Sequence, residues 1–386
     1  MEVFILKITD IKTVFVDQFM YVQVYTDEGI VGLGESGAWG LIKASGEVVN
    51  AFKPYLIGMN PLDIEHIWQY MYRCYHFRGA AMMGAISAID IALWDIAGKY
   101  HGVPIHKLLG GQTRKKARCY VHVKGENLDV IVQKAKEAKA AGYSAIGHLS
   151  PFMDVKRDED YFETYAQKLD RAINRIGAYR EAVGNEVDLC LELHRRMKPA
   201  EAIDLAREIE QFHPMYIEDP TIPDNFDSMA HITSQINIPL ATGERLHTIQ
   251  EFQMLLKRDA VDYARPSLGI CGGISGAKKI AAIAEANGVG IIPHSPQGCS
   301  NVITTASLQF DASISNFTIQ ELPHDPSFPL YADITKTQVQ REGAFLIIPN
   351  GPGLGIELLP DAAERLPFRP RPMVTRLHVD GSVYDD

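Results

Sequence analysis

The sequence predicts a (β/α)₈ barrel that carries a smaller α+β domain at its N-terminus, and two observations support this fold class. After Gly110-Gly111, short apolar runs typical of buried parallel strands alternate with helical stretches. Within this region Glu192, Glu218 and Glu244 recur at an even spacing of 26 residues, each at the end of an apolar run. One strand and one helix per repeat is the pattern of a parallel barrel.

The first part of the chain, residues 1–113, is predicted to form the α+β domain, which caps the barrel. Alternating apolar and polar residues predict antiparallel strands at Ile5–Val16, Tyr21–Thr26 and Ile30–Glu35. Asp27-Glu28-Gly29 is typical of the hairpin turn between the last two strands. Helical periodicity then runs from about residue 41 to residue 110.

The barrel is predicted over residues 114–335. Its eight strands are expected at Ala117–Val123, Ala145–Leu149, Val187–Leu193, Met215–Ile217, Ile238–Thr242, Tyr263–Arg265, Gly290–Pro293 and Phe317–Gln320. Helices between them are expected at Val130–Ala141, Tyr161–Val183, Pro199–Phe212, Ile249–Leu256 and Ile274–Asn287. An open doubly wound sheet is the alternative, but no glycine-rich phosphate loop follows the first strand. The segment 336–386, with a short strand at Phe345–Ile348, is expected to return to the first domain.

Composition excludes several classes of partner. The 386-residue chain has a formal net charge of −10, which disfavours nucleic acid and anionic membranes. Five scattered cysteines without a CxxC spacing indicate reduced thiols. The first residues become charged too soon for a signal peptide, and no long uncharged apolar run predicts a membrane span. We therefore expect a cytoplasmic homo-oligomer that acts on a small molecule.

The three evenly spaced glutamates predict a metal site. Carboxylates at equivalent ends of successive parallel strands converge at one mouth of a barrel, where the chemistry of such folds takes place. Three hard oxygen ligands suit Mg²⁺, which usually keeps further positions for water or substrate. A single glutamate after a strand more often interacts with a helix dipole, but three at equal spacing favour metal ligands.

Further polar residues follow the predicted strands. His194 lies two residues after Glu192, so both side chains would share one face of an extended strand. His294 follows strand seven in a proline-flanked segment, and Gln320 and Glu321 end strand eight. A lone histidine near a strand end is more often structural than catalytic. Its spacing to Glu192 favours His194, and the change from apolar to polar sequence favours His294.

These residues stand in motifs that resemble the enolase superfamily, in its mandelate racemase-like branch and nearest to acid-sugar dehydratases of the galactonate, gluconate and mannonate type. The resemblance covers nearly the whole chain. The motifs are Gly84–Lys99 with Pro104 and Leu108–Gly111, then Tyr216–Pro220, Ala241–Arg245, Cys271–Ile274 and Ile292–Pro296. Each motif alone is weak, and together they are highly specific.

The resemblance implies that the three glutamates hold one Mg²⁺ per subunit. It also implies that His294 removes the proton α to a substrate carboxylate and that His194 protonates the departing hydroxyl. Glu321, or the neighbouring glutamine, would hydrogen-bond the substrate carboxylate. The first domain would supply substrate-facing loops around Asp17–Tyr21 and Trp39–Ala44.

Two departures from the family pattern concern the base. Relatives usually pair the strand-seven histidine with an aspartate 27 residues earlier, and Ser267 stands at that position here. Without a carboxylate, the imidazolium of His294 is less stabilised and its tautomer is less firmly fixed. Some branches of the family carry a Lys-x-Lys on strand two, and this chain has none, because Ser144-Ala-Ile-Gly-His148 offers only His148. His148 and Lys124 are the nearest alternative bases.

The expected function is therefore Mg²⁺-dependent dehydration of an aldonate or aldarate to a 2-keto-3-deoxy sugar acid, which is a lyase reaction. A racemase, epimerase or cycloisomerase of an acid sugar or its lactone is the alternative among enzymes. Such an enzyme would form the same enolate intermediate by removing the proton α to the carboxylate. A catalytically silent barrel with a binding or regulatory role is the alternative from another class, which Ser267 keeps open. The sequence does not identify the sugar, because specificity depends on loop shapes.

Overall fold

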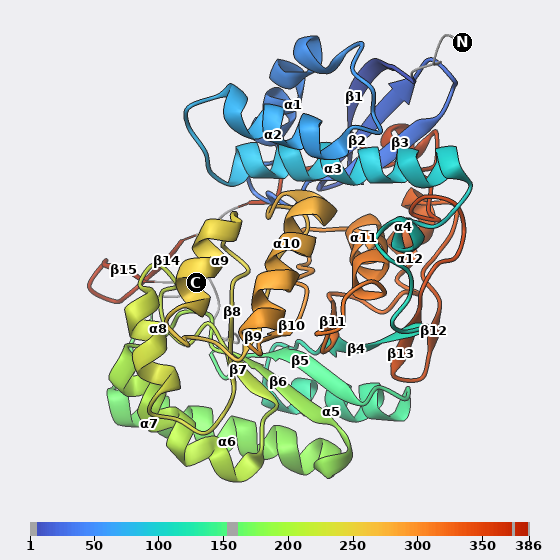
Figure 1. The fold of residues 1–386 in the computed structure, drawn as a ribbon. Coiled ribbons are helices and arrows are strands. Elements are labelled where there is room, and N and C mark those ends of the chain that lie inside the picture. Colours follow the sequence, from blue (N-terminus) through green and yellow to red (C-terminus); the bar gives the residue numbers. More distant parts are fainter. Residues whose placement is uncertain (1–5, 153–160, 373–374, 385–386) are drawn as a thin grey trace.

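The computed structural model describes residues 6–152, 161–372 and 375–384 of the chain. A smaller domain, blue in Figure 1, stands against one end of a larger barrel. Strand pairing and layer arrangement confirm the predicted fold class, a (β/α)₈ barrel with an N-terminal α+β cap that the C-terminal segment completes.

The cap is an antiparallel sheet packed on helices. Its strands pair in the order β1 (Ile8–Val16), β2 (Phe19–Thr26) and β3 (Val31–Glu35). Its helices are α1 (Ile42–Leu56), α2 (Ile64–Cys74), α3 (Ala80–His101) and α4 (Ile105–Leu108). The predicted strands lie within three residues of these bounds, except that Ile5 falls outside the described residues.

The barrel is a closed ring of parallel strands. In chain order the strands are β4 (Lys116–His122), β5 (Ala145–Leu149), β6 (Asp188–Glu192), β7 (Tyr216–Glu218), β8 (Leu240–Thr242), β9 (Tyr263–Ala264), β10 (Gly290–Ile291) and β11 (Gln320–Leu322). Neighbours pair in this order up to β10, and β11 pairs with β4. A parallel bridge between Ile291 and Phe317 connects β10 to the chain that leads into β11, which closes the ring.

Helices surround the ring and connect its strands. They are α5 (Leu128–Ala140), α6 (Tyr165–Val183), α7 (Pro199–Ile209), α8 (Phe226–Thr233), α9 (Ile249–Leu256), α10 (Gly273–Ala286), α11 (Asn301–Asp311) and α12 (Pro329–Ile334). Single turns of 3₁₀ helix at Gly184–Glu186 and Glu210–Phe212 follow α6 and α7. The start of α6 is fixed by a capping box at Thr164 and Gln167, four residues after the predicted start.

Among the barrel helices, the sequence interpretation missed α8, α11 and α12, and it misplaced one strand. Every residue of α11 is buried, so this helix lacks the polar face that marks an amphipathic helix. The short helix α8 follows a proline-rich turn and was not predicted either. The last barrel strand begins at Gln320 and not at Phe317, because Phe317 makes only the isolated bridge to Ile291.

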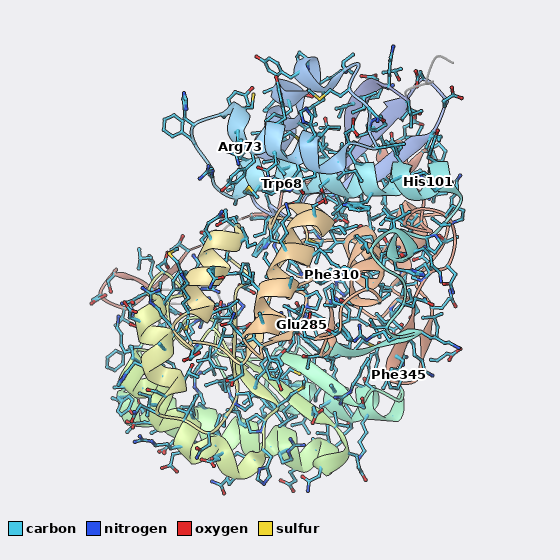
Figure 2. All side chains as sticks on the ribbon, viewed as in Figure 1. Trp68, Arg73, His101, Glu285, Phe310 and Phe345 are labelled. Atoms are coloured by element: carbon cyan, nitrogen blue, oxygen red, sulfur yellow. The ribbon has the colours of Figure 1, made fainter. Side chains whose placement is uncertain are left out.

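The cap and the barrel meet along α3. This helix is long and apolar enough to cross a membrane by length and composition, but 83% of its apolar window is buried inside the protein, as in a core helix. Figure 2 places Trp68 of α2 beside α10, and its indole Nε1 donates to the Gly272 carbonyl at 2.9 Å. Trp94 of α3 reaches the same helix by donating to Ser275 Oγ at 2.9 Å.

The C-terminal segment contacts both domains. Strand β13 (Phe345–Ile347) pairs antiparallel with the start of β4 and with β12 (Arg341–Glu342). Further along, past α13 (Ala362–Arg365), backbone hydrogen bonds of 2.9 and 2.7 Å join Asp17 of the cap to Leu366 and Arg369. Residues 375–384 contain a hairpin of β14 (Arg376–Leu377) and β15 (Val383–Tyr384), which lies beside the barrel in Figure 1.

Candidate active site

A cavity of about 1030 Å³ opens at the C-terminal ends of the barrel strands. All parts of the molecule line it: Trp39 comes from the cap, Tyr384 comes from the C-terminal hairpin, and the floor is the barrel mouth. Of the two cap loops expected to face substrate, the one at Trp39 lies on the cavity. Residues of the other, 17–21, are not part of the described lining.

The predicted metal ligands converge at this mouth. Glu192 and Glu218 end β6 and β7 in register, and Glu244 follows β8. One carboxylate oxygen from each lies within 4.8 Å of those of the other two. Burial and the neighbouring Glu218 raise the pKa of Glu192 well above its usual range, and burial with repulsion from Glu244 does the same to Glu218. Mutual repulsion of this kind is relieved by a cation, so the donor set fits a divalent metal ion.

A buried arginine lies next to the glutamates, and sequence reasoning gave it no role. Arg265, just after β9, forms ion pairs with Glu218 and, at 2.6 Å between Nη2 and Oε2, with Glu321. Its guanidinium also donates to the Tyr120 hydroxyl at 3.1 Å. A charged residue at the end of a predicted strand is the signal that would have found it.

Glu321 is the centre of a hydrogen-bond network. Its Oε2 accepts the Ser295 backbone N–H at 2.8 Å, and its Oε1 lies 2.7 Å from His122 Nε2 at the end of β4. Burial alone would raise the pKa of Glu321, but Arg265 and His294 hold it below its usual range. An ionised carboxylate only accepts hydrogen bonds, so a lowered pKa makes Glu321 an acceptor in this ligand-free state. The alternative donor, Gln320, gives its amide N–H to the carbonyl of Glu321.

Glu192, Glu218 and Glu244 follow successive strands and so form a row of carboxylates, and His294 lies at the Glu244 end of this row. Its Nε2 is 3.1 Å from Glu244 Oε2. Its Nδ1 is buried and has no hydrogen-bond partner among the described residues. Ser267, which is buried and also lines the cavity, makes no hydrogen bond to this nitrogen.

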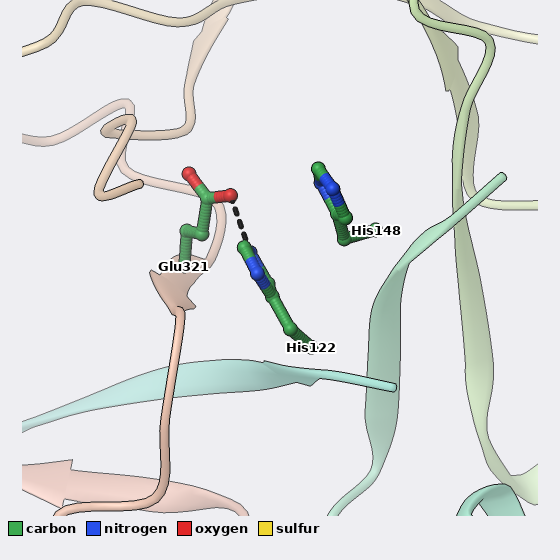
Figure 3. Close-up of side chains that lie close together, drawn as sticks. All are labelled: His122, His148 and Glu321. Atoms are coloured by element: carbon green, nitrogen blue, oxygen red, sulfur yellow. Dashed lines mark hydrogen bonds and ion pairs between the residues drawn. The ribbon is translucent and has the colours of Figure 1, made fainter. Parts of the chain in front are cut away.

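Three imidazoles occupy the other end of the row, at the ends of β4, β5 and β6. His122 stacks on His148 with ring centroids 4.6 Å apart, as Figure 3 shows, and His148 meets His194 edge to face at 5.2 Å. The backbone N–H of His194 donates to Glu192 Oε1 at 2.8 Å, which fixes the turn after β6. Burial lowers the pKa of His122 to about 4 and lowers that of His148 as well. The sequence had singled out His194, had kept His148 as a secondary candidate and had missed His122.

The fold and this site are those of a known family. Residues 6–110 match the mandelate racemase / muconate lactonizing enzyme N-terminal domain, and residues 131–362 match the enolase C-terminal domain-like model. The chain therefore belongs to the enolase superfamily, in its mandelate racemase / muconate lactonizing enzyme branch, as the motifs of the sequence had indicated.

Individual relatives narrow the class of reaction. A D-galactonate dehydratase of Xanthomonas oryzae pv. oryzae is 33% identical over 389 residues, which span 98% of this chain and 99% of the relative. A mandelate racemase/muconate lactonizing enzyme-like protein from Roseovarius sp. TM1035 superposes with a TM-score of 0.88 at 29% identity, covering 98% and 99% of the two chains. A member of the enolase superfamily from Salmonella Typhimurium superposes at 0.86 with 30% identity, covering 93% and 98%. The chain is accordingly an enzyme of the lyase class, a hydro-lyase.

Proposed function

We propose that this enzyme is a Mg²⁺-dependent dehydratase of a sugar acid, either an aldonate or an aldarate. It removes the proton α to the carboxylate and eliminates the 3-hydroxyl as water, which gives a 2-keto-3-deoxy sugar acid after tautomerisation. One observation carries the proposal: three convergent carboxylates lie between an imidazole at one end, His294, and a second imidazole at the other, His194. The dehydratase relatives support the same reaction class.

The residues that would hold the metal are Glu192, Glu218 and Glu244. Their three oxygens and the repulsion between them suit a hard divalent cation, and an all-carboxylate set favours Mg²⁺ over softer metals. When bound, Mg²⁺ supplies positive charge that stabilises the second negative charge of the enediolate.

The two histidines divide the proton transfers between them. His294 takes the α-proton on Nε2, the nitrogen now directed at Glu244. His194, beside Glu192, gives a proton to the leaving hydroxyl, which departs as water. General acid or base assistance of this kind contributes about 10²–10⁴-fold per group.

Glu321 faces the substrate carboxylate from the other side of the site. Two ionised carboxylates repel each other, so binding of the substrate raises the pKa of Glu321 and favours a shared proton between them. The network through His122, Arg265 and the Ser295 N–H holds the Glu321 side chain in place for that contact.

The test is a panel of aldonic and aldaric acids assayed with and without Mg²⁺, with 2-keto product detected as its semicarbazone. At least one acid should give Mg²⁺-dependent product. His194→Asn should block elimination while the α-proton still exchanges with solvent deuterium, because the base and the metal ligands remain. A wild-type enzyme that returns an epimer or a lactone and no keto acid would replace this proposal with 1,1-proton transfer or cycloisomerisation. The cytoplasmic location, the homo-oligomer and the three segment boundaries remain predictions from the sequence.

A further inference from the structure

Of the three imidazoles at the ends of β4, β5 and β6, the proposed mechanism leaves one, His148, without a task. His148 lines the cavity, and neither of its ring nitrogens has a hydrogen-bond partner within the described part of the chain. The neighbouring His122 is different, because its Nε2 already meets Glu321 at 2.7 Å, and Figure 3 shows this contact with the His148 ring standing beside it. His148 is therefore the imidazole whose polar atoms are open to a ligand.

The backbone at His148 is strained in a way that aims the side chain. His148 has φ of +53°, in the left-handed region that non-glycine residues rarely adopt, and His194 at the end of the next strand has the same φ. Such conformations cost energy, and they cluster where a function depends on the direction of the side chain. Both histidines turn out of their strands at the barrel mouth, yet only His194 has a role in the mechanism.

The position of His148 among the other site residues indicates which substrate carbon it would face. It lies between His122 and Glu321 on one side and His194 on the other. In the proposed function, Glu321 faces the carboxylate, which is C1, and His194 faces the hydroxyl on C3. A group between them faces C2. His294, at the opposite end of the carboxylate row, takes the hydrogen of C2.

The tetrahedral geometry of C2 then determines which substituent of this carbon lies against His148. C2 carries C1, C3, a hydrogen and a hydroxyl, and with the hydrogen directed at His294 the hydroxyl points away from it. We propose that His148 hydrogen-bonds the C2 hydroxyl and thereby selects the configuration at that carbon; this inference rests on the proposed function. The imidazole offers one donor and one acceptor, which suits a hydroxyl. The C2 epimer would place its hydrogen against His148 and leave those groups unpaired.

A metal ion is the other ligand that these side chains could bind. Ligand atoms of His122, His148 and Glu321 lie within 4.8 Å of one another. However, the guanidinium of Arg265 lies 2.6 Å from Glu321 Oε2, and His122 Nε2 occupies the other oxygen. A cation there would be repelled by Arg265 and would displace an existing hydrogen bond, so the geometry favours a neutral hydroxyl.

The experiment measures binding to pairs of C2 epimers, gluconate with mannonate and galactonate with talonate. The His294→Asn variant in Mg²⁺ serves as background, because without the base the ligands bind without reacting. Calorimetric titration of this variant should show a preference for one epimer of the best-bound pair. Adding His148→Phe, which keeps the ring and removes the nitrogens, should reduce that preference by about 3- to 10-fold, the loss expected for one hydrogen bond. The 2-deoxy analogue of the preferred epimer should bind equally well with either residue at position 148.

A matched control is available in the chain. His213 also has a positive φ, +46°, but it is exposed and outside the cavity lining, so His213→Phe should leave the epimer preference unchanged. If His148→Phe does not fold, His148→Gly provides the comparison, because glycine adopts the left-handed region without strain and has no side chain that could bond the hydroxyl.

Three results would overturn the inference. The first is an epimer preference that does not respond to His148. The second is wild-type exchange of the α-proton in both C2 epimers with His148 required for one, which would make His148 a second base. The third is two bound metal ions per chain with one lost in His148→Phe. If no sugar acid binds or reacts, the proposed function fails; if sugar acids react and only the epimer test fails, the role of His148 alone is wrong.

Discussion

Buried carboxylates occur in two regions of this molecule, and their partners differ. Between the cap and the barrel, Glu35 accepts the Ser300 and Ile303 N–H groups at the start of α11, at 2.6 and 3.1 Å. Asp90 similarly accepts the Ser275 N–H of α10 at 3.0 Å. At the barrel mouth, by contrast, the carboxylates of Glu192, Glu218 and Glu244 face one another.

Asp95 also lies between the cap and the barrel, and of these carboxylates it has hydrogen-bond donors from the most parts of the chain. Its oxygens accept N–H groups from Leu33 of the cap and Leu354 of the C-terminal segment at 2.9 and 2.8 Å, and Lys99 Nζ at 2.7 Å. The fold itself supplies these donors, so the carboxylate stabilises the native state. At the mouth the glutamates also have partners, such as Arg265 and the His194 N–H, but burial and mutual repulsion still raise the pKa values of Glu192 and Glu218, so the site favours a cation. Burial alone does not separate a structural carboxylate from a functional one; the nature of its partners does.

The largest expected effect is a loss of activity when a carboxylate at the barrel mouth is changed. Glu218→Gln should lower kcat/KM by more than about 10³-fold, because an amide is a poor ligand for Mg²⁺ and the enediolate charge is then unmatched. The metal-free protein should lose little stability, since weaker attraction to Arg265 is offset by less repulsion from Glu192 and Glu244. Kinetics and chemical unfolding in EDTA measure the two effects. Substantial turnover with metal still bound would contradict the ligand assignment.

The next effect is on stability, at the domain boundary. Asp95→Ala should reduce the free energy of unfolding by about 3–5 kcal/mol, because it leaves Lys99 and two buried backbone N–H groups without their acceptor. Urea unfolding measures the loss, and the affinity of the folded variant for Mg²⁺ is the control that should not change. A loss below about 1 kcal/mol would mean that the boundary does not depend on this carboxylate.

Glu35 should make stability depend on pH. Burial raises the pKa of Glu35 from its ordinary value of 4.5 to about 7, despite its hydrogen bonds to Ser300 and Ile303. The native state therefore holds this proton more tightly than the unfolded state, so its contribution is full below about pH 4.5 and is lost as pH rises towards 7. The full difference is about 3 kcal/mol. Glu35→Gln should flatten the profile by that amount, with exposed Glu28→Gln as the matched control; parallel profiles for wild type and Glu35→Gln would contradict this.

The smallest expected effect is the increase in the free energy of unfolding that Mg²⁺ binding causes. Mg²⁺ at 100 times its Kd should add about 2.7 kcal/mol to the free energy of unfolding of the wild type. The same increment should appear on top of the destabilised Asp95→Ala baseline and should vanish in Glu218→Gln. Thermal unfolding with Mg²⁺ and with EDTA tests this. An increment that survives in Glu218→Gln would place the bound cation elsewhere.

Much of the barrel could be predicted from local pattern. The ends of successive parallel strands meet at one mouth, so even spacing of Glu192, Glu218 and Glu244 was enough to bring them together. Helix α9 was predicted at its observed bounds, because its capping residues and apolar stripe agree. Helix α11 was missed for the opposite reason, since a helix buried on every side carries no amphipathic signal.

The sequence by itself determined the fold class, the family and the convergence of the three glutamates, because strand period and motif spacing are local properties of the chain. Only the tertiary structure brought Arg265 and His122 to Glu321, since closing the ring sets β11 against β4 across about 200 residues of chain. It also decided that Arg265 and His294 hold the pKa of Glu321 below its usual range and that His148 lies on the cavity, because pKa shifts and backbone strain depend on neighbours that no local pattern specifies.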